Sequence, residues 1–252
     1  MITGGSGGIG AAIAVELGRR GWRCVLLARR EERLREVAAA CNGEYELCDV
    51  SDRAAVEAVA ARLRERHPRI GLLVNNAGIP GRGGFLDIEP DKLEALVRTN
   101  FFAGVWCLRA FLPALEAAGR SDVVNIVSVA GTVAVPASGP YAAAKHAQLA
   151  FSRAVGPELR PRGVRVHTVN PGFVETEGFP QRIRMRNQMV ASVVIDAEDV
   201  ARHVMRVLER DRRETFVPWW YRVPAIGQAL VPGLVSRLLA RRHENDHRSN
   251  VR

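Results

Sequence analysis

The chain opens with the glycine-rich stretch Met1-Ile2-Thr3-Gly4-Gly5-Ser6-Gly7-Gly8-Ile9-Gly10. Three of its glycines, Gly4, Gly8 and Gly10, are spaced for a tight turn, for close approach of a pyrophosphate, and for close helix-to-strand contact. A helix predicted from Ala11 to Arg20 would direct its N-terminal amides at the phosphates. The stretch therefore predicts a strand–turn–helix unit that binds a dinucleotide, the alternative being a merely flexible loop.

The strand before this turn is unusually short, because only Met1, Ile2 and Thr3 are available for it. In such a fold the first strand lies in the middle of a parallel sheet and is buried on both faces. We therefore expect either that the natural start lies several residues upstream or that the centre of the sheet is truncated. We favour the upstream start.

The second predicted strand, Arg23 to Ala28, ends at Arg29 and Arg30. At this strand end an acid hydrogen-bonds the ribose 2′-hydroxyl of NAD, whereas arginine accommodates the 2′-phosphate of NADP. Two arginines and no acid favour NADP(H). The alternative is that both arginines only open the exposed helix predicted from Glu31 to Ala40.

The next two predicted strands also end in polar or small residues. Tyr45 to Cys48 runs into Asp49, which could reach an adenine amine, or the residues after it could simply cap the next helix. Gly71 to Val74 runs into Asn75-Asn76-Ala77-Gly78. Ligands bind beyond the carboxyl ends of strands in open parallel sheets, so both strand ends are candidate cofactor contacts.

Tyr141 and Lys145 lie on one face of the helix predicted from about Gly139 to Leu159, because they are four residues apart. A free tyrosine has a pKa near ~10, and lowering it to about 7 requires roughly 4 kcal/mol of preferential stabilisation of the phenolate. A nearby ammonium can supply part of that. Apart from Lys92, Lys145 is the only lysine in an arginine-rich chain. The pair predicts a tyrosine acid/base, with a packed ring and a solvated amine as the alternative.

Two further polar residues stand in apolar surroundings. Ser128 follows the predicted fifth strand, Val123 to Val127. Asn100 lies inside a helix predicted from about Pro90 to Leu112, where asparagine is disfavoured. The Asn100 side chain is therefore either hydrogen-bonded to a neighbouring backbone group or kept for a functional role.

The remainder of the predicted domain, which spans residues 1–220, contains a long insertion. The sixth strand, Arg165 to Asn170, is broken by Pro171-Gly172, and the segment 172–195 follows. A structureless segment of that length in a compact domain predicts a substrate lid. A helix from Asp196 to Arg210 and a short strand from Thr215 to Val217 complete the domain.

Composition narrows the function further. A length of 252 residues fits one large α/β domain. The four cysteines lack metal-ligand spacing, so we expect no metal site, no disulfide, and a reducing, cytoplasmic compartment. We also expect no membrane-spanning segment, because the sequence has no apolar run of 18 residues. The net charge of +9 is not accompanied by a nucleic-acid-reading motif, so we expect no nucleic-acid partner.

Residues 221–252 form a basic, amphipathic extension of the same domain. Apolar residues recur three to four apart between Ala225 and Arg242, and Arg237 and Arg241 flank them. Pro232-Gly233 argues against one unbroken helix. Such a segment can cover the substrate cleft or a partner subunit, which we favour, or lie peripherally on a membrane surface.

Together these motifs resemble the short-chain dehydrogenase/reductase family over about residues 1–220. In chain order the motifs are Thr3-Gly4-x-x-x-Gly8-Ile9-Gly10, Asp49, Asn75-Asn76-Ala77-Gly78, Asn100, Ser128, Tyr141-x-x-x-Lys145, and Asn170-Pro171-Gly172 followed by Thr176. The resemblance implies a single Rossmann-type, doubly wound parallel sheet in order 3-2-1-4-5-6-7 with helices on both faces. It also implies a homodimer or homotetramer, in which the helices carrying Asn100 and Tyr141 form the interface.

The resemblance implies four catalytic residues, Asn100, Ser128, Tyr141 and Lys145. Tyr141 would exchange a proton with the substrate oxygen, which Ser128 would orient. Lys145 would lower the pKa of Tyr141 and hold the nicotinamide ribose, and Asn100 would position a water linking Lys145 to solvent. Thr176 would meet the nicotinamide carboxamide. The full expected set of cofactor-binding residues is Thr3, Gly4, Ser6, Gly8, Ile9, Gly10, Arg29, Arg30, Asp49, Val50, Asn76, Ala77, Gly78, Tyr141, Lys145, Pro171, Gly172, Val174 and Thr176.

We therefore expect an NADP(H)-dependent oxidoreductase that interconverts a secondary alcohol and a ketone on a largely apolar small molecule. One alternative is a 3-oxoacyl-thioester reductase, in which basic residues near the cleft would face a phosphopantetheine carrier. Another is a non-catalytic NADP-binding scaffold or sensor, which is disfavoured because all four catalytic positions hold competent residues.

Overall fold

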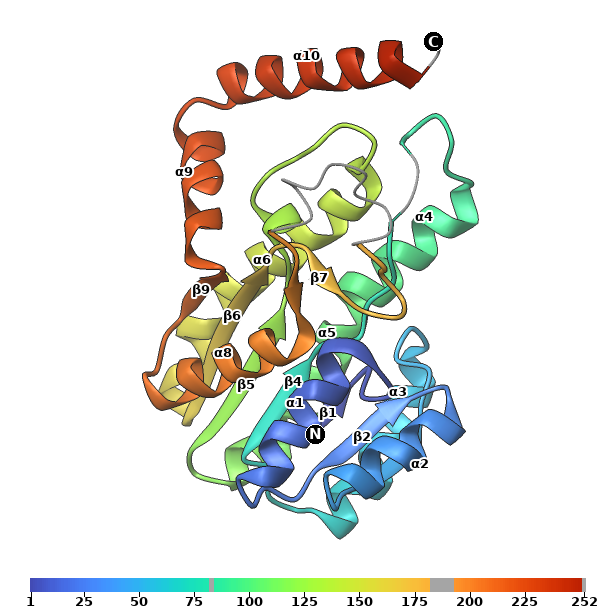
Figure 1. Cartoon of the computed structure of the whole chain (residues 1–252). Helices are drawn as coiled ribbons and strands as arrows, with labels where there is room; N and C mark the ends of the chain where they lie inside the picture. Colours follow the sequence, from blue (N-terminus) through green and yellow to red (C-terminus); the bar gives the residue numbers. More distant parts are fainter. Residues whose placement is uncertain (82–83, 182–192, 251–252) are drawn as a thin grey trace.

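The computed structural model describes residues 1–81, 84–181 and 193–250, and for residues 242–250 it describes the backbone alone. Its main sheet has seven parallel strands in the order β3-β2-β1-β4-β5-β6-β9 (Figure 1). The predicted order is confirmed, with β9 as the seventh strand. The strands are β1 (Ile2–Thr3), β2 (Val25–Ala28), β3 (Glu44–Leu47), β4 (Leu72–Asn75), β5 (Ser121–Ile126), β6 (Val164–Pro171) and β9 (Glu214–Val217).

Helices follow most of these strands. They are α1 (Gly8–Arg19), α2 (Glu31–Ala40), α3 (Arg53–Arg66), α4 (Pro90–Val97), α5 (Ala103–Ala117), α6 (Gly139–Leu159), α8 (Ala197–Glu209), α9 (Arg222–Leu230) and α10 (Pro232–Asn250). The start of α3 is fixed by Asp52, whose carboxylate accepts hydrogen bonds from the amides of Ala54 and Ala55. This contact stabilises the helix by satisfying donors that have no partner within it.

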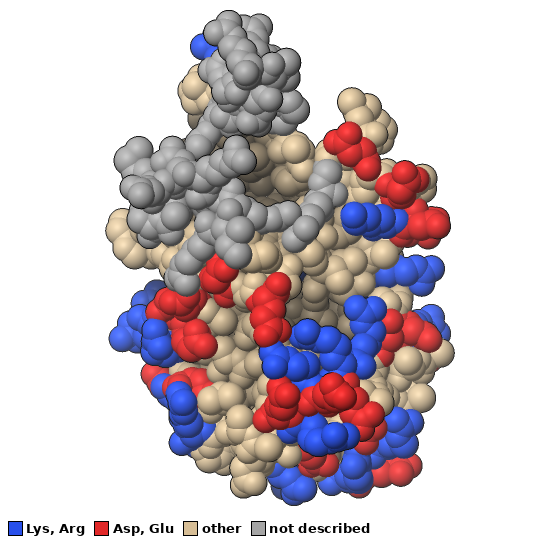
Figure 2. All heavy atoms as spheres, turned by 45° about the vertical axis from the view of Figure 1, so that its right-hand side comes forward, with Lys and Arg blue, Asp and Glu red and all other residues tan. Residues whose placement is uncertain are grey.

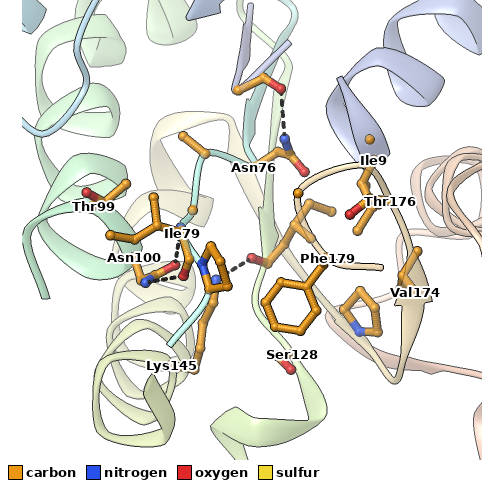
Figure 3. Close-up of a pocket in the computed structure, with 18 of the residues that line it drawn as sticks. Ile9, Asn76, Ile79, Thr99, Asn100, Ser128, Lys145, Val174, Thr176 and Phe179 are labelled. Carbon is orange, nitrogen blue, oxygen red and sulfur yellow. Dashed lines mark hydrogen bonds between the residues drawn. The ribbon is translucent and has the colours of Figure 1, made fainter. Parts of the chain in front are cut away.

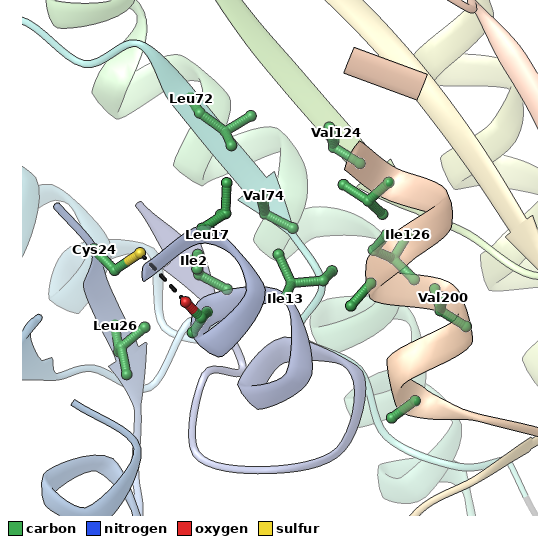
Figure 4. Packing of buried hydrophobic residues seen from close by; sticks show 14 of the residues in the cluster. Ile2, Ile13, Leu17, Cys24, Leu26, Leu72, Val74, Val124, Ile126 and Val200 are labelled. Atoms are coloured by element: carbon green, nitrogen blue, oxygen red, sulfur yellow. Dashed lines mark hydrogen bonds between the residues drawn. The ribbon is translucent and has the colours of Figure 1, made fainter. Parts of the chain in front are cut away.

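The sheet is covered on both faces by apolar helix surfaces. Helices α1, α2 and α8 pack on one face through residues such as Ile13, Leu34 and Val200 (Figures 1 and 4). Helices α3, α5 and α6 contribute to the cluster on the other face. Neighbouring residues of one strand divide between the two clusters, as Leu73 and Val74 of β4 do. This explains why the central strands β2 and β4 read as nearly continuous apolar runs rather than alternating ones.

Strand β1 is short and lies at the centre of the sheet, as predicted, while the upstream start that we favour stays a prediction. Ile2 pairs with Leu26 of β2 on one side and with Val74 of β4 on the other. The pairing extends to Met1, whose backbone carbonyl accepts from the amide of Val74 at 2.8 Å. The buried ammonium of Met1 donates to the carbonyl of Leu72 at 2.8 Å.

The predicted helix from Pro90 to Leu112 is longer than expected and contains an irregular turn. It continues to Ala117, and residues Arg98–Phe102 form a π-helical turn between α4 and α5. A π-turn inserts one extra residue into an α-helix and is frequent at functional sites. Asn100 is the buried residue of this turn.

The expected lid segment 172–195 is structured at both ends. Val174–Glu175 forms β7, which pairs in parallel with β8 (Ile195–Asp196). An antiparallel bridge joins Thr176 to Phe179. Residues 182–192 lie outside the described residues, so the lid remains a prediction.

The C-terminal extension consists of two helices separated by Val231, which confirms the predicted break at Pro232-Gly233. The segments 219–230 and 232–241 are bent by 113° with respect to each other. In Figure 1, α9 rises from the end of β9 and α10 crosses above the rest of the molecule. The exposed side chains here include Trp219, Leu230 and Leu234.

By length and composition, one continuous helix within the described residues could cross a membrane, and it spans Pro90–Ala117. Its buried residues include Leu96, Phe111 and Leu115, two of which belong to the core on one face of the sheet. We therefore assign it to the core of the domain. The C-terminal helix pair also passes the same test as one broken span.

The described residues show no cluster of His, Cys, Asp and Glu that could hold a metal ion. All four cysteines are free and buried.

Candidate active site

A groove of ≈ 880 Å³ runs along the carboxyl ends of the central strands. It begins at the glycine-rich turn, passes the ends of β2 and β4, and reaches Ser128, Tyr141 and Lys145 at its other end. All four predicted catalytic residues line it. So do all the predicted cofactor-binding residues except Thr3 and Gly10.

The glycine-rich turn is shaped for a phosphate group. Gly4 and Gly8 have φ values of +67° and +54°, which side-chain-bearing residues rarely adopt. A Cβ at Gly8 would lie 3.1 Å from Cγ2 of Thr176, so the glycine also allows close packing across the groove. Helix α1 has no side-chain cap at Gly7. Its N-terminal amides therefore remain available to an anion, and the residues present fit a dinucleotide pyrophosphate.

Thr3 and Gly10 were also predicted to bind the cofactor but do not line the groove, so their contact with a cofactor stays a prediction. The Thr3 hydroxyl accepts from the amides of Asn76 and Ala77, each at 3.0 Å. A Cβ at Gly10 would collide with the carbonyl oxygen of Gly4. Both residues therefore shape the turn, because they join it to the neighbouring strand end.

Arginines and an aspartate lie at the end of the groove where β2 and β3 finish. Arg29 donates to Asp49 at 3.5 Å, and Asp49 accepts from the amide and the hydroxyl of Ser51 at 2.9 and 2.7 Å. Burial opposes ionisation of Asp49, but these hydrogen bonds and the Arg29 charge hold its pKa below the usual range. The Arg30 guanidinium lies against Ser6 of the glycine-rich turn.

The opposite end of the groove holds Tyr141, Ser128 and Lys145. Nζ of Lys145 lies 6.0 Å from the centroid of the Tyr141 ring. It donates to the carbonyl of Ile126 at 3.2 Å and to Oε1 of Gln148 at 2.9 Å (Figure 3 shows the surroundings). Lys145 is 4% exposed, and this burial lowers its pKa to about 7.

The pKa of Tyr141 departs from the expectation. Burial raises it to about 12, and a hydrogen bond with Ser128 acts in the opposite direction. The expected lowering by Lys145 is therefore not found in this structure, because desolvation of the phenolate outweighs the hydrogen bond with Ser128. At neutral pH the phenol is protonated and is a proton donor.

Asn100 is satisfied by a neighbouring backbone, one of the two options that its sequence position left open. Its Nδ2 donates to the carbonyl of Ile79 at 3.0 Å, and its Oδ1 accepts from the amide of Ile79 at 3.2 Å. These two bonds fix the loop after β4 to the π-turn. In Figure 3, Asn100 and Lys145 lie on one side of the groove, and Ile9 and Thr176 lie on the other.

After β6, the chain passes close beneath Tyr221. A Cβ at Gly172 would collide with the Tyr221 ring, and the amide of Gly172 donates to the carbonyl of Val217 at 2.9 Å. Glycine is therefore needed here for packing against the C-terminal part of the domain. Pro171 and Val174 line the groove, as expected.

Three site residues were missed from the sequence. Gln148 holds the Lys145 ammonium, and its i,i+3 spacing from Lys145 on one helix was a usable signal. Phe179 places its ring centroid 6.5 Å from that of Tyr141, and Glu177 lies beside Arg30 and Arg33. No local sequence pattern indicates these two contacts, since the partners are distant in the chain.

Comparison with known proteins agrees with this geometry. The model of the family described as short chain dehydrogenase matches residues 1–187. The chain belongs to the short-chain dehydrogenase family. Members of this family with solved structures include a metagenomic short-chain oxidoreductase in complex with NADP, which is 35% identical. The similarity covers 82% of this chain and 88% of that one, with a TM-score of 0.69.

Two curated members of the short-chain dehydrogenase family illustrate its range of substrates. The 3-oxoacyl-[acyl-carrier-protein] reductase of Escherichia coli is 29% identical over 81% of this chain and 86% of its own. A 3beta-hydroxysteroid dehydrogenase of Mediterraneibacter gnavus is 31% identical over 70% of this chain and 66% of its own.

Proposed function

We propose that this short-chain dehydrogenase is an NADP(H)-dependent oxidoreductase that interconverts a secondary alcohol and a ketone on a largely apolar substrate. The observation that carries the proposal is one continuous groove with two chemically distinct ends. One end presents the uncapped amides of α1 and a pair of arginines, and the other presents Tyr141, Ser128 and Lys145.

Tyr141 supplies the proton during reduction. The bound nicotinamide supplies or accepts the hydride, which the protein itself cannot do. Negative charge then develops on the substrate oxygen, and the Ser128 hydroxyl and the Tyr141 phenol are paired to donate to it. The phenol is protonated at neutral pH, so it enters the reaction in the form that reduction requires.

Lys145 and Asn100 support the proton transfer by Tyr141. The Lys145 ammonium lies beneath the Tyr141 ring, and its hydrogen bonds to Ile126 and Gln148 hold it there. From this position it can donate to a ribose hydroxyl and favour the phenolate when Tyr141 has given up its proton. Asn100 fixes the loop that forms the wall at this end, and we retain its proposed role in placing a water.

NADP(H) is proposed over NAD(H) because of the groups at the end of β2. Arg29 and Arg30 both line the groove, and the exposed fractions of their side chains are 67% and 56%. Guanidinium groups bind phosphate oxygens through paired hydrogen bonds. Asp49 is held by Ser51 and Arg29, in a position to accept from an adenine amine.

The apolar substrate class follows from the walls around Tyr141. Val133, Val135, Phe173 and Phe179 line this part of the groove, and Val135 and Phe173 are 45% and 40% exposed. Exposed apolar side chains at the reactive end favour a substrate that covers them.

The second candidate is a 3-oxoacyl-thioester reductase, supported by the similarity to the Escherichia coli carrier-protein reductase. NADPH oxidation with apolar cyclic ketones and with 3-oxoacyl N-acetylcysteamine thioesters separates the two. Faster turnover of ketones supports the first proposal. Turnover of the thioesters, together with no turnover of the ketones, supports the second. A purified, cofactor-binding protein that turns over neither class would favour the scaffold or sensor.

We propose a homo-oligomer whose interface lies on α5 and α6. Phe102 is 40% exposed and stacks on Trp106 at 5.6 Å, and Phe101 packs edge-on against Phe151 of α6 at 6.1 Å. A second copy of the chain would cover this aromatic surface. Light scattering after gel filtration tests this, because Phe102→Glu should shift a dimer or tetramer toward the monomer. A wild-type monomer would refute it.

We also propose that the C-terminal arm, residues 219–241, rests on an anionic membrane surface. Trp219, Leu230 and Leu238 are 75%, 75% and 56% exposed. No acidic residue occurs between Glu214 and Glu244, while the interval contains four arginines. Uniform positive charge beside exposed apolar side chains matches anionic lipid and would repel a second copy of the same arm.

Flotation with vesicles tests this surface. Binding to phosphatidylcholine vesicles containing phosphatidylglycerol, lost in high salt and in Trp219→Ser/Leu230→Ser, supports it. Equal recovery of the protein with vesicles that contain and that lack anionic lipid would refute the proposal. A finding that the arm is needed only for oligomer formation would refute it as well.

A further inference from the structure

Basic and acidic side chains lie interspersed on the face of the molecule that Figure 2 shows. One ion-pair cluster joins the glycine-rich turn, helix α2 and the chain after β7. Arg30 donates from Nε to the hydroxyl of Ser6 at 3.3 Å and from Nη2 to the Ser6 carbonyl at 3.2 Å. Its guanidinium thus lies across the turn, and a Cβ at Gly7 would come within 2.8 Å of Nη2. The absence of a side chain at Gly7 therefore makes room for this arrangement.

Glu177 completes the cluster from a distant part of the chain. Its Oε2 lies 3.8 Å from Nη1 of Arg30, and its Oε1 accepts a hydrogen bond from Nη2 of Arg33. Glu177 and Arg30 both line the cofactor groove. The carboxylate therefore occupies a place among the same guanidinium groups that a phosphate at this end would use.

This ion pair is suited to displacement. The side chains of Arg30 and Glu177 are 56% and 61% exposed, and ion pairs at such exposure contribute little to stability. A phosphate carries more charge than a carboxylate and offers three acceptor oxygens. A 2′-phosphate can therefore replace the Glu177 carboxylate on Arg30, whereas a cofactor without that phosphate leaves the pair in place.

We infer that Glu177 is a specificity-determining residue that competes with the 2′-phosphate of NADP(H) for Arg30 and so limits the preference for NADP(H) over NAD(H). The inference rests on the proposed NADP(H) function and deepens it. The arginines attract the phosphate, and Glu177 weakens that attraction both by occupying the site and by like-charge repulsion.

The test removes the charge of Glu177 and keeps its size. Isothermal titration with 2′,5′-ADP and 5′-AMP, and fluorescence titration with NADPH and NADH, are compared for wild type and Glu177→Gln. Binding of 2′,5′-ADP and NADPH should tighten roughly three- to tenfold, the effect of one exposed like charge near a phosphate, while binding of 5′-AMP and NADH should change less than about twofold. Raising the salt concentration should reduce the gain.

A matched control is Glu36→Gln. Glu36 also pairs with Arg33, at 2.9 Å from its Nη1, but it does not line the groove. This variant should bind all four probes as wild type does. An equal gain in Glu36→Gln would overturn the inference, because it would assign the effect to Arg33 or to net charge.

Unchanged or weaker NADPH binding in Glu177→Gln, or equal changes for NADPH and NADH, would also overturn the inference and leave the proposed function standing. A wild-type protein that is folded and binds neither NADPH nor NADH would instead remove the proposed function, and the inference with it.

Discussion

Replacing Lys145 by methionine should change how the stability of the protein depends on pH. Lys145 is 4% exposed, and burial lowers its pKa from 10.5 to about 7. Between these two values the unfolded chain binds a proton at this site that the folded protein does not bind. The free energy of unfolding of wild type therefore rises with pH, by up to ~1.4 kcal/mol per pH unit, across the window from about 7 to 10.5.

The magnitude follows from the two pKa values. Integrating the linkage relation from pH 7 to pH 9.5 gives a stabilisation of wild type by about 3 kcal/mol from this one group. Lys145→Met has no such group, so the difference in unfolding free energy between wild type and variant should move by that amount in favour of wild type. Other titrating groups are shared by both proteins and cancel.

Urea unfolding followed by tryptophan fluorescence at several pH values measures this difference. Lys92→Met is the matched control, because Lys92 is the only other lysine and is exposed on α4. The difference in unfolding free energy between Lys92→Met and wild type should stay constant with pH. A constant difference for Lys145→Met as well would refute the reasoning, since it would mean that the protein stabilises the buried ammonium.

Three other variants test separate parts of the structure. Gly10→Ala should abolish NADPH binding or lower the free energy of unfolding by more than about 2 kcal/mol, because the added Cβ has no space beside the phosphate turn. A variant that binds NADPH and has normal stability would contradict this. Asp122→Asn should destabilise by about 1.5–3 kcal/mol at pH 7, because a neutral amide replaces the carboxylate that His167 and Arg165 contact at 2.8 and 2.7 Å. Burial opposes ionisation of Asp122, but hydrogen bonds from His167 and Arg165 hold its pKa low. The unfolding free energies of wild type and Asp122→Asn should therefore converge as the pH falls below about 4. Urea unfolding that shows no such convergence would contradict this prediction. Arg29→Ala/Arg30→Ala should weaken NADPH binding at least about tenfold more than NADH binding in fluorescence titrations, and an equal loss would refute the phosphate role.

Much of the fold could be predicted because the strand ends carry local signals. The predicted strands before Asp49, Asn75 and Ser128 were each followed by polar residues, and parallel strands bring such ends to one edge of the sheet. The predicted boundaries of α2 and α6 were also confirmed, whereas the helix predicted from Pro90 to Leu112 continues to Ala117. The π-turn at Asn100 could not be read from the sequence, because its irregularity is supported by two hydrogen bonds to Ile79 in another part of the chain.

The electrostatics of the site were the least predictable part. The spacing of Tyr141 and Lys145 correctly indicated their proximity but not the cost of burying them, which dominates the pKa values of both. The contact of Glu177 with Arg33 joins residues 144 positions apart. Such a contact depends on the path of the chain after β7, which no local pattern specifies.

We propose Tyr141 as the proton donor of an NADP(H)-dependent reduction. The most direct measurement is the turnover number of Tyr141→Phe for NADPH-dependent ketone reduction, together with its Kd for NADPH. Tyr45→Phe, which removes a hydroxyl 3.4 Å from Glu31 on the surface, is the control. We predict that turnover of Tyr141→Phe falls at least about a hundredfold, with NADPH binding within about threefold of wild type and the control unaffected. Undiminished turnover of Tyr141→Phe would contradict the account.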